Sequence, residues 1–252
     1  FHPDLVQAAS SDVDNTYLYN HAQRRACMLQ AIGACPDELD APVAGVELAD
    51  AATALRGTYY RQLAAIMAQD ATAPDPCIIQ PTISRELSDL ADSALEGALA
   101  IARHEVEGSD HVRFVIIGMG KLGAQELNYV SDVDLIYAVE PADDAIGNQE
   151  LIRIGTKMGT TLQRVCQSVI MGVAAPALWQ IDGGLRPEGK DGSLVRTIES
   201  HKGYYEQWAE SWEFQALLKA RPVAGDRALG QAYMDMTRPF VWSASKRDNF
   251  VY

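Results

Sequence analysis

The sequence predicts an α+β fold in which a small sheet is embedded in a predominantly helical chain. In the first third of the chain, apolar residues recur every three or four positions, as they do along one face of a helix. The middle holds short β-branched and aromatic runs around a glycine-rich turn. We expect a helical N-terminal region over residues 1–110, a sheet-bearing core over 111–200 and a helical C-terminal extension over 201–252.

Three helices are expected in the first region, over about 15–32, over 46–71 and from near Ser84 to Gly108. Prolines and glycines between 35 and 45, and again over 73–76, predict breaks between these helices. The apolar stripe of the second helix consists of Leu48, Ala52, Leu55, Tyr59, Leu63 and Ile66.

The central sheet is predicted from three short segments. Residues 113–117 and 133–139 are rich in β-branched and aromatic side chains, and residues 178–182 form a third, shorter run. A short helix that opens with glycines is expected between the first two strands. The helices expected after the second strand cover residues 148–169, 200–220 and 228–245.

Composition excludes several classes of function. The net charge of -13 over 252 residues repels a polyanion, so we expect no binding of nucleic acid. The four cysteines and five histidines show no paired metal-ligand spacing, which indicates reduced thiols and no zinc site. No apolar run approaches the roughly 18 residues of a spanning helix, and the N-terminus lacks the basic region and apolar core of a signal peptide, so the sequence predicts a cytoplasmic protein without a membrane segment. The start at Phe1 rather than Met indicates an excised fragment.

Three glycines follow the first predicted strand. Gly118, Gly120 and Gly123 match a dinucleotide-binding pattern, and Glu140 lies near the separation expected for a ribose-binding acid. A hydride-transfer enzyme is therefore one interpretation. The next strand, however, begins after only a few residues and opens with two acids, which a buried central strand has no reason to carry. A Walker phosphate loop is excluded because Lys121 lacks the required spacer and the following Ser or Thr.

The two acids that open the second strand favour another chemistry. Asp132 and Asp134 are two positions apart, so on a strand they share one face, while Val133 and Leu135 face the packed side. Carboxylates at that separation attract hard cations such as Mg²⁺, and two such ions can promote an in-line displacement at phosphorus. The nearby glycines would let backbone N–H groups approach a phosphate. A merely solvated strand entrance remains the alternative.

A third acid, Asp182, ends the third predicted strand, and Arg186 and Lys190 follow it. These cations are suited to phosphate oxygens, although simple surface charge is the alternative for both. The candidate catalytic and metal-binding residues are Asp132, Asp134 and Asp182. The candidate nucleotide- and phosphate-binding residues are Gly118, Gly120, Lys121, Gly123, Ser131, Arg186 and Lys190.

Three motifs, at residues 118–136, 180–190 and 212–226, resemble in sequence and order those of the bacterial glutamine synthetase adenylyltransferase/adenylyl-removing enzymes. The resemblance runs from about Asp89 to the C-terminus. It implies a DNA polymerase beta-like nucleotidyltransferase core with a small mixed sheet, a glycine loop and three metal-binding acids. Those acids map onto Asp132, Asp134 and Asp182.

One feature departs from the family pattern. Gly183 and Gly184 stand where many members place an arginine just before Leu-Arg-Pro. The departure implies that one phosphate contact is lost or is supplied from elsewhere.

The resemblance also implies a reaction. Full-length members have two catalytic halves: the N-terminal one removes AMP from a tyrosine of glutamine synthetase by phosphorolysis, giving ADP, and the C-terminal one attaches AMP from ATP. Residues 126–128 and 219–221 resemble the removing half. The implied function is therefore Mg²⁺-dependent removal of AMP from glutamine synthetase, with nucleotide and phosphate as ligands. The attaching half is one alternative, and a silent docking module for glutamine synthetase or a nitrogen-regulatory signal protein is another.

Overall fold

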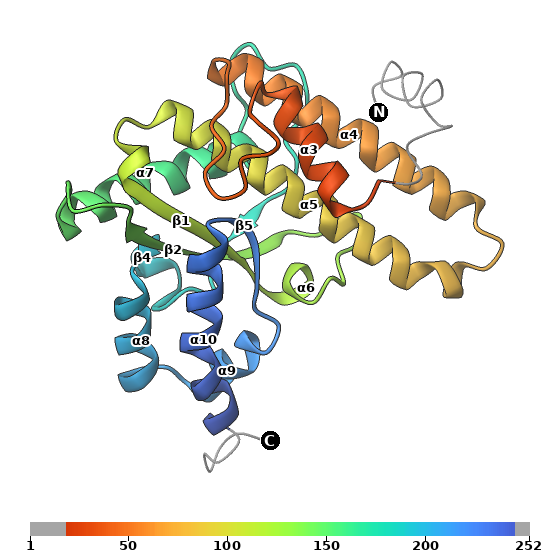
Figure 1. Ribbon diagram of the computed structural model, residues 1–252. Coiled ribbons are helices and arrows are strands. Elements are labelled where there is room, and N and C mark those ends of the chain that lie inside the picture. The colour runs from red at the N-terminus through yellow and green to blue at the C-terminus, as the bar shows by residue number, and fades with distance from the viewer. Residues whose placement is uncertain (1–18, 245–252) are drawn as a thin grey trace.

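The computed structural model describes residues 19–244 (Figure 1). Its sheet has β1 at the centre, antiparallel to β2 on one side and to β5 on the other. The short strands β3 and β4 each pair with β2 in parallel. The sheet is therefore small and mixed, which confirms the predicted α+β class. The strands are β1 (Val112–Gly118), β2 (Val133–Pro141), β3 (Ile181–Asp182), β4 (Val195–Arg196) and β5 (Arg221–Gly225).

Helices make up most of the rest of the described chain. They are α3 (His21–Ala31), α4 (Leu48–Thr72), α5 (Pro76–Glu105), α6 (Gly120–Gly123), α7 (Asn148–Gln167), α8 (Ile198–Gln207), α9 (Ser211–Leu217) and α10 (Arg227–Ala244), with 3₁₀ turns at Ser109–His111 and Gly189–Asp191. Within residues 19–244 no helix combines the length and apolarity needed to cross a membrane. The parts of the predicted helices at 15–18 and at Ser245 lie outside the described residues.

The sheet separates two apolar cores. Alternate residues of a strand point to opposite faces, so Phe114 and Ile116 join the first core while Val115 and Ile117 join the second. Helices α3, α4, α5 and α7 complete the first core, and α8, α9 and α10 complete the second (Figure 1). Burying each such large side chain contributes roughly 1.5–3 kcal/mol. Because both faces of the strands carry such side chains, a helical layer is favoured on each side of the sheet.

Helix α5 begins earlier than the sequence predicted, at Pro76 rather than near Ser84. The side chain of Asp75 accepts hydrogen bonds from the backbone N–H groups of Cys77 and Ile78 and so caps the helix. Pro76 fits at the first helical position, where a backbone N–H has no partner within the helix. The predicted break over 73–76 does separate α4 from α5, and its last residue, Pro76, is also the first residue of α5.

The C-terminal third also differs from the prediction. The helix expected over 200–220 is divided into α8 and α9, where Glu210 and Glu213 form a capping box at the start of α9. Strand β5 then enters the sheet beside β1, so the segment expected to be a helical extension supplies a strand. The third predicted strand shortens to two residues, Ile181 and Asp182.

Candidate active site

Two of the three candidate acids lie side by side. In the parallel pairing of β2 with β3, Val133 is opposite Ile181 and Asp134 is opposite Asp182. Asp132 immediately precedes β2 and is exposed, while Asp134 is half-buried. Since Val133 is buried in the first core, alternation directs Asp134 to the opposite face, toward the side of α8–α10. The pairing of β2 with β3 thus brings Asp134 and Asp182, from two separate segments of the chain, to one edge of the sheet.

The charges around Asp134 repel its ionised form. Burial raises the pKa of Asp134, and the negative charges of Asp132 and Asp182 raise it further, while Lys121 opposes the shift. A nearby divalent cation would relieve this repulsion.

The chemistry of this donor set fits a divalent cation. Carboxylate oxygens are the ligands that Mg²⁺ prefers, and Asp132, Asp134 and Asp182 are the residues that would hold it. Across residues 19–244 no three His, Cys, Asp or Glu side chains are already gathered at metal-binding distances. The Nζ of Lys190 lies 3.7 Å from Oδ1 of Asp182, where it partly neutralises that carboxylate. The metal-binding role of the three acids stays a prediction.

Among the glycines between β1 and α6, Gly120 is the one that borders these acids. It has a φ of +53°, and a Cβ there would lie 2.5 Å from Oδ2 of Asp134. A Cβ at Gly118 would lie 2.7 Å from Val223, and one at Gly123 would overlap the carbonyl of Lys219. The structure therefore gives Gly118 and Gly123 a packing role against the β5 side, and their expected contact with phosphate stays a prediction.

The loop after β3 is folded around Arg186. Its guanidinium donates to the carbonyl oxygens of Gly183 (2.9 Å), Lys190 (2.8 Å) and Gly192 (3.2 Å). A Cβ on Gly183 would lie against an Nη atom of this guanidinium, so a larger residue there would displace the end of the Arg186 side chain. The N–H of Gly184 donates to Oδ1 of Asp182 at 2.7 Å. Arg186 thus shapes the loop that borders Asp182.

The exposed cations beside the acids are Lys121 and Lys190. Ser131 is half-buried and directly precedes Asp132. These three residues, and Arg186 in addition to its contacts within the loop, remain predicted contacts for phosphate or nucleotide.

A second polar cluster was missed by the sequence analysis. Arg221 on β5 donates to both carboxylate oxygens of Asp92 on α5, at 2.5 and 3.2 Å. The same guanidinium donates to the carbonyls of Leu122 (3.0 Å) and Gly123 (3.2 Å), so it ties α5 to the end of α6. Asp92 lies on the buried face of a strongly apolar helix, and a carboxylate in that position is the sequence signal that could have revealed the pair.

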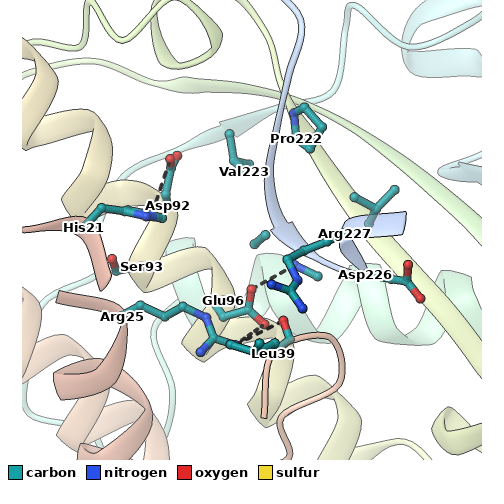
Figure 2. A pocket seen from close by; sticks show the side chains of 13 residues that line it. His21, Arg25, Leu39, Asp92, Ser93, Glu96, Pro222, Val223, Asp226 and Arg227 are labelled. Atoms are coloured by element: carbon teal, nitrogen blue, oxygen red, sulfur yellow. Dashed lines mark hydrogen bonds and ion pairs between the residues drawn. The ribbon is translucent and has the colours of Figure 1, made fainter. Parts of the chain in front are cut away.

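Asp92 also lines a cavity of about 230 Å³ between α3, α5 and β5. Figure 2 shows His21 and Arg25 of α3 reaching toward Asp92 and Glu96 of α5. Burial raises the pKa of Asp92 to about 7, against the opposing charge of Arg221, and burial lowers the pKa of His21. Glu96 accepts from the N–H of Gly225 at 2.9 Å. This cluster joins the helical region to the sheet and shares no residue with the acids at β2 and β3.

Comparison with known proteins agrees with the resemblance. Residues 2–236 match the family described as glutamate-ammonia ligase adenylyltransferase. The chain is 77% identical over 252 residues to the bifunctional glutamine synthetase adenylyltransferase/adenylyl-removing enzyme of Bifidobacterium longum, covering 100% of this chain and 23% of that protein. Enzymes of the same description from Cutibacterium acnes and Leifsonia xyli subsp. xyli are 44% and 43% identical, over 89% and 98% of this chain and 22% and 25% of theirs. The chain thus spans about a quarter of the length of these relatives.

Proposed function

This chain belongs to the glutamate-ammonia ligase adenylyltransferase family, and from that premise we propose that it removes AMP from adenylylated glutamine synthetase by phosphorolysis. The observation that carries the proposal is the pairing of Asp134 with Asp182 on adjacent parallel strands, next to Asp132. Burial and the charges of Asp132 and Asp182 raise the pKa of Asp134, and a bound cation would relieve this repulsion and neutralise charge in a phosphoryl transfer.

The reaction joins inorganic phosphate to the α-phosphorus of the adenylyl-tyrosine. A phosphate oxygen forms the new P–O bond, the bond to the tyrosine oxygen breaks, and ADP and the free tyrosine are the products. When bound at the three acids, Mg²⁺ supplies charge neutralisation at the phosphoryl oxygens. Phosphate is already an anion and needs no strong base, whereas the phenolate, whose conjugate acid has a pKa of about 10, takes up a proton on leaving.

The surrounding side chains bind and orient the reactants. Lys121 and Lys190 are exposed beside the acids, so their ammonium groups can hold the oxygens of the entering phosphate. Arg186 keeps the loop folded so that Lys190 stays close to Asp182. Gly120 leaves the space that the carboxylate of Asp134 occupies.

The direction of the reaction is inferred from two segments. Residues 126–128 and 219–221 resemble the removing half, and they lie in contact, since the Nζ of Lys219 is 2.8 Å from Oε2 of Glu126. If the removing and attaching halves differ in sequence in these two segments, both differences lie at one place in the fold, next to α6. The attaching half remains the alternative, because the three acids would serve either direction.

The test supplies the chain with Mg²⁺ and one of two substrate pairs. With phosphate and adenylylated glutamine synthetase, we expect ADP to be released in a reaction that saturates with phosphate. With ATP and unmodified glutamine synthetase, we expect no transfer. Transfer only from ATP would assign the attaching activity, and binding of glutamine synthetase without product in either arm would indicate a docking module.

A further inference from the structure

Asp182 is delivered to the site by an irregular stretch of chain. Between the end of α7 at Gln167 and the start of β3 at Ile181, residues 168–180 form no helix or strand. Strand β3 itself has two residues, and beside it the N–H of Val133 donates to the carbonyl of Gln180 at 3.0 Å. So short a strand cannot fix its own position, and the register of Asp182 with Asp134 depends on what holds the stretch in front of it.

Arg56 of α4 holds the beginning of this stretch. The residue is 1% exposed, and its guanidinium donates to the carbonyls of Val165 (3.0 and 2.7 Å), Ser168 (2.7 Å) and Ala175 (3.2 Å). Val165 and Ser168 lie at the C-terminal end of α7, where the last carbonyls have no partner within the helix. A buried guanidinium that satisfies three carbonyls therefore fixes both the end of α7 and the turn that follows.

The same face of α4 holds the second part of the stretch. The hydroxyl of Tyr60 donates to the carbonyl of Ala177, and the indole of Trp179 donates to the hydroxyl of Tyr59 at 3.1 Å. Positions 56, 59 and 60 are three and four apart, so they project from one side of the helix. Two further bonds come from the end of α7: Leu178 N–H to the carbonyl of Cys166 at 2.8 Å, and Ile181 N–H to Oε1 of Gln167 at 2.9 Å.

We propose that Arg56 is a positioning residue for the active site: it clamps residues 168–175 against α4, and this clamp keeps Asp182 in register with Asp134. The inference rests on the proposed function for its catalytic consequence. Arginine is required because one planar fork reaches three carbonyls at once. A lysine keeps the charge but presents a single compact ammonium group, so it leaves at least one of these carbonyls without its partner.

The test compares Arg56→Lys with Arg24→Lys. Arg24 is the matched control: it is also 1% exposed, but its partners are the side chains of Gln62 and Glu86, neither of which belongs to residues 168–180. Three readouts are needed: amide hydrogen exchange at Leu178 and Ile181, affinity for Mn²⁺ alone measured by electron paramagnetic resonance, and kcat and KM for phosphorolysis.

We expect Arg56→Lys to speed exchange at both amides, to weaken Mn²⁺ binding about tenfold, as loss of support for a metal ligand does, and to lower kcat more than KM. Arg24→Lys should lower the melting temperature comparably without these changes. Unchanged exchange and Mn²⁺ affinity in Arg56→Lys, or equal changes in the control, would overturn the proposal. If Arg56→Lys does not fold, Tyr60→Phe removes the bond from the same face of α4 to Ala177, the next part of the stretch that leads to Asp182, and the same readouts with the same expected directions apply to it.

The exchange measurement separates this inference from the proposed function, because it requires neither metal nor turnover. If wild type binds no Mn²⁺ and releases no ADP, but exchange at Ile181 rises in Arg56→Lys alone, the clamp stands and the proposed function fails.

Discussion

The chain has two groups of carboxylates that differ in their partners. On α5, Asp92 is paired with Arg221, and Glu96 lies 3.7 Å from Arg103. At the edge of the sheet, Asp132, Asp134 and Asp182 have no arginine within ion-pair distance anywhere in residues 19–244. The cation within that distance is Lys190, which lies 3.7 Å from Asp182 and is largely exposed.

The difference indicates what each group is for. The guanidinium of Arg221 donates to both oxygens of Asp92, so this carboxylate has its cation within the chain and joins elements of the fold, although burial still raises its pKa. Carboxylates that repel one another at a surface retain a need for positive charge, and a ligand or metal ion can meet it. The same residue type thus has a structural role on α5 and, we propose, a catalytic one on β2 and β3.

The largest expected effect is on turnover. Asp134→Asn keeps the shape of the side chain but removes a charge from the repelling group, so the rate of AMP removal should fall about 100-fold or more. The melting temperature should stay the same or rise, because the repulsion from Asp132 and Asp182 is lost. Activity and thermal unfolding measured on one preparation check both statements. Asp144→Asn, at an exposed position, is the control, and a wild-type rate in Asp134→Asn would exclude the catalytic role.

In the arginine-paired group, removing one charge should lower the stability of the fold rather than preserve or raise it. Arg221→Met leaves Asp92 buried without its partner, which should cost about 3 kcal/mol of unfolding free energy, the lower end for buried pairs because Arg221 is 27% exposed. Denaturant titration measures this loss. The double change Arg221→Met with Asp92→Leu should recover most of the stability. No recovery would mean that the contacts of Arg221 with the carbonyls of Leu122 and Gly123 dominate instead.

Within residues 19–244, the buried imidazole of His201 forms no ion pair with a carboxylate, unlike Asp92 with its arginine. His201 is 1% exposed beneath β2 among the rings of Tyr205 and Tyr233, and burial lowers its pKa to about 4, helped by the charge of Arg196. Below pH 6.5 the unfolded chain binds a proton at this histidine that the folded chain does not. Stability should therefore fall as the pH drops from 6.5 to 4, by up to about 3 kcal/mol from this group.

The variant His201→Phe should lack that part of the pH dependence. Unfolding free energies of wild type and variant, measured at pH 4.5 and 7, give the difference directly. Parallel pH profiles for the two proteins would show that His201 has the same pKa in the folded and unfolded states, which would contradict the prediction.

The smallest expected effect concerns the space beside Asp134. Gly120→Ala places a side chain at a φ of +53°, which costs roughly 1–2 kcal/mol, and sets its Cβ 2.5 Å from Oδ2 of Asp134. Stability should fall slightly and activity more strongly, as the carboxylate moves. Combining Gly120→Ala with Asp134→Ala should reduce the stability cost, since the overlap disappears. If Gly120→Ala lowers stability equally with Asp134 and with Ala at position 134, the loss of stability comes from the strained backbone alone.

The spacing of apolar residues along the sequence predicted several helices and strands correctly. Helices α4 and α7 and strands β1 and β2 begin within about two residues of their predicted positions, because apolar periodicity determines them. Strand β5 was missed. Its five residues include a proline and have no clear alternation, and their extended form depends on pairing with β1, far away in the chain.

In the candidate site, too, local spacing predicted some features, while others depend on contacts that local spacing does not determine. The shared face of Asp132 and Asp134 follows from strand geometry, and the approach of Asp182 was expected because it ends a strand. The partners of Arg186 could not be predicted, since they are backbone carbonyls of its own loop, set by turns that the sequence pattern does not specify. The pair of Asp92 and Arg221 was missed for a related reason, because a tertiary contact brings the two together.

The position of β5 also has a consequence for how the chain is made. Strand β1 is translated long before β5, yet β5 covers one of its two edges, and the N–H of Asp226 donates to the carbonyl of Phe114 at 2.9 Å. Until residues 221–225 leave the ribosome, β1 can pair with β2 but keeps its other edge open. An open, apolar strand edge is a template for other strands. A nascent or truncated chain that stops before Arg221 therefore carries a self-association hazard that the finished sheet conceals.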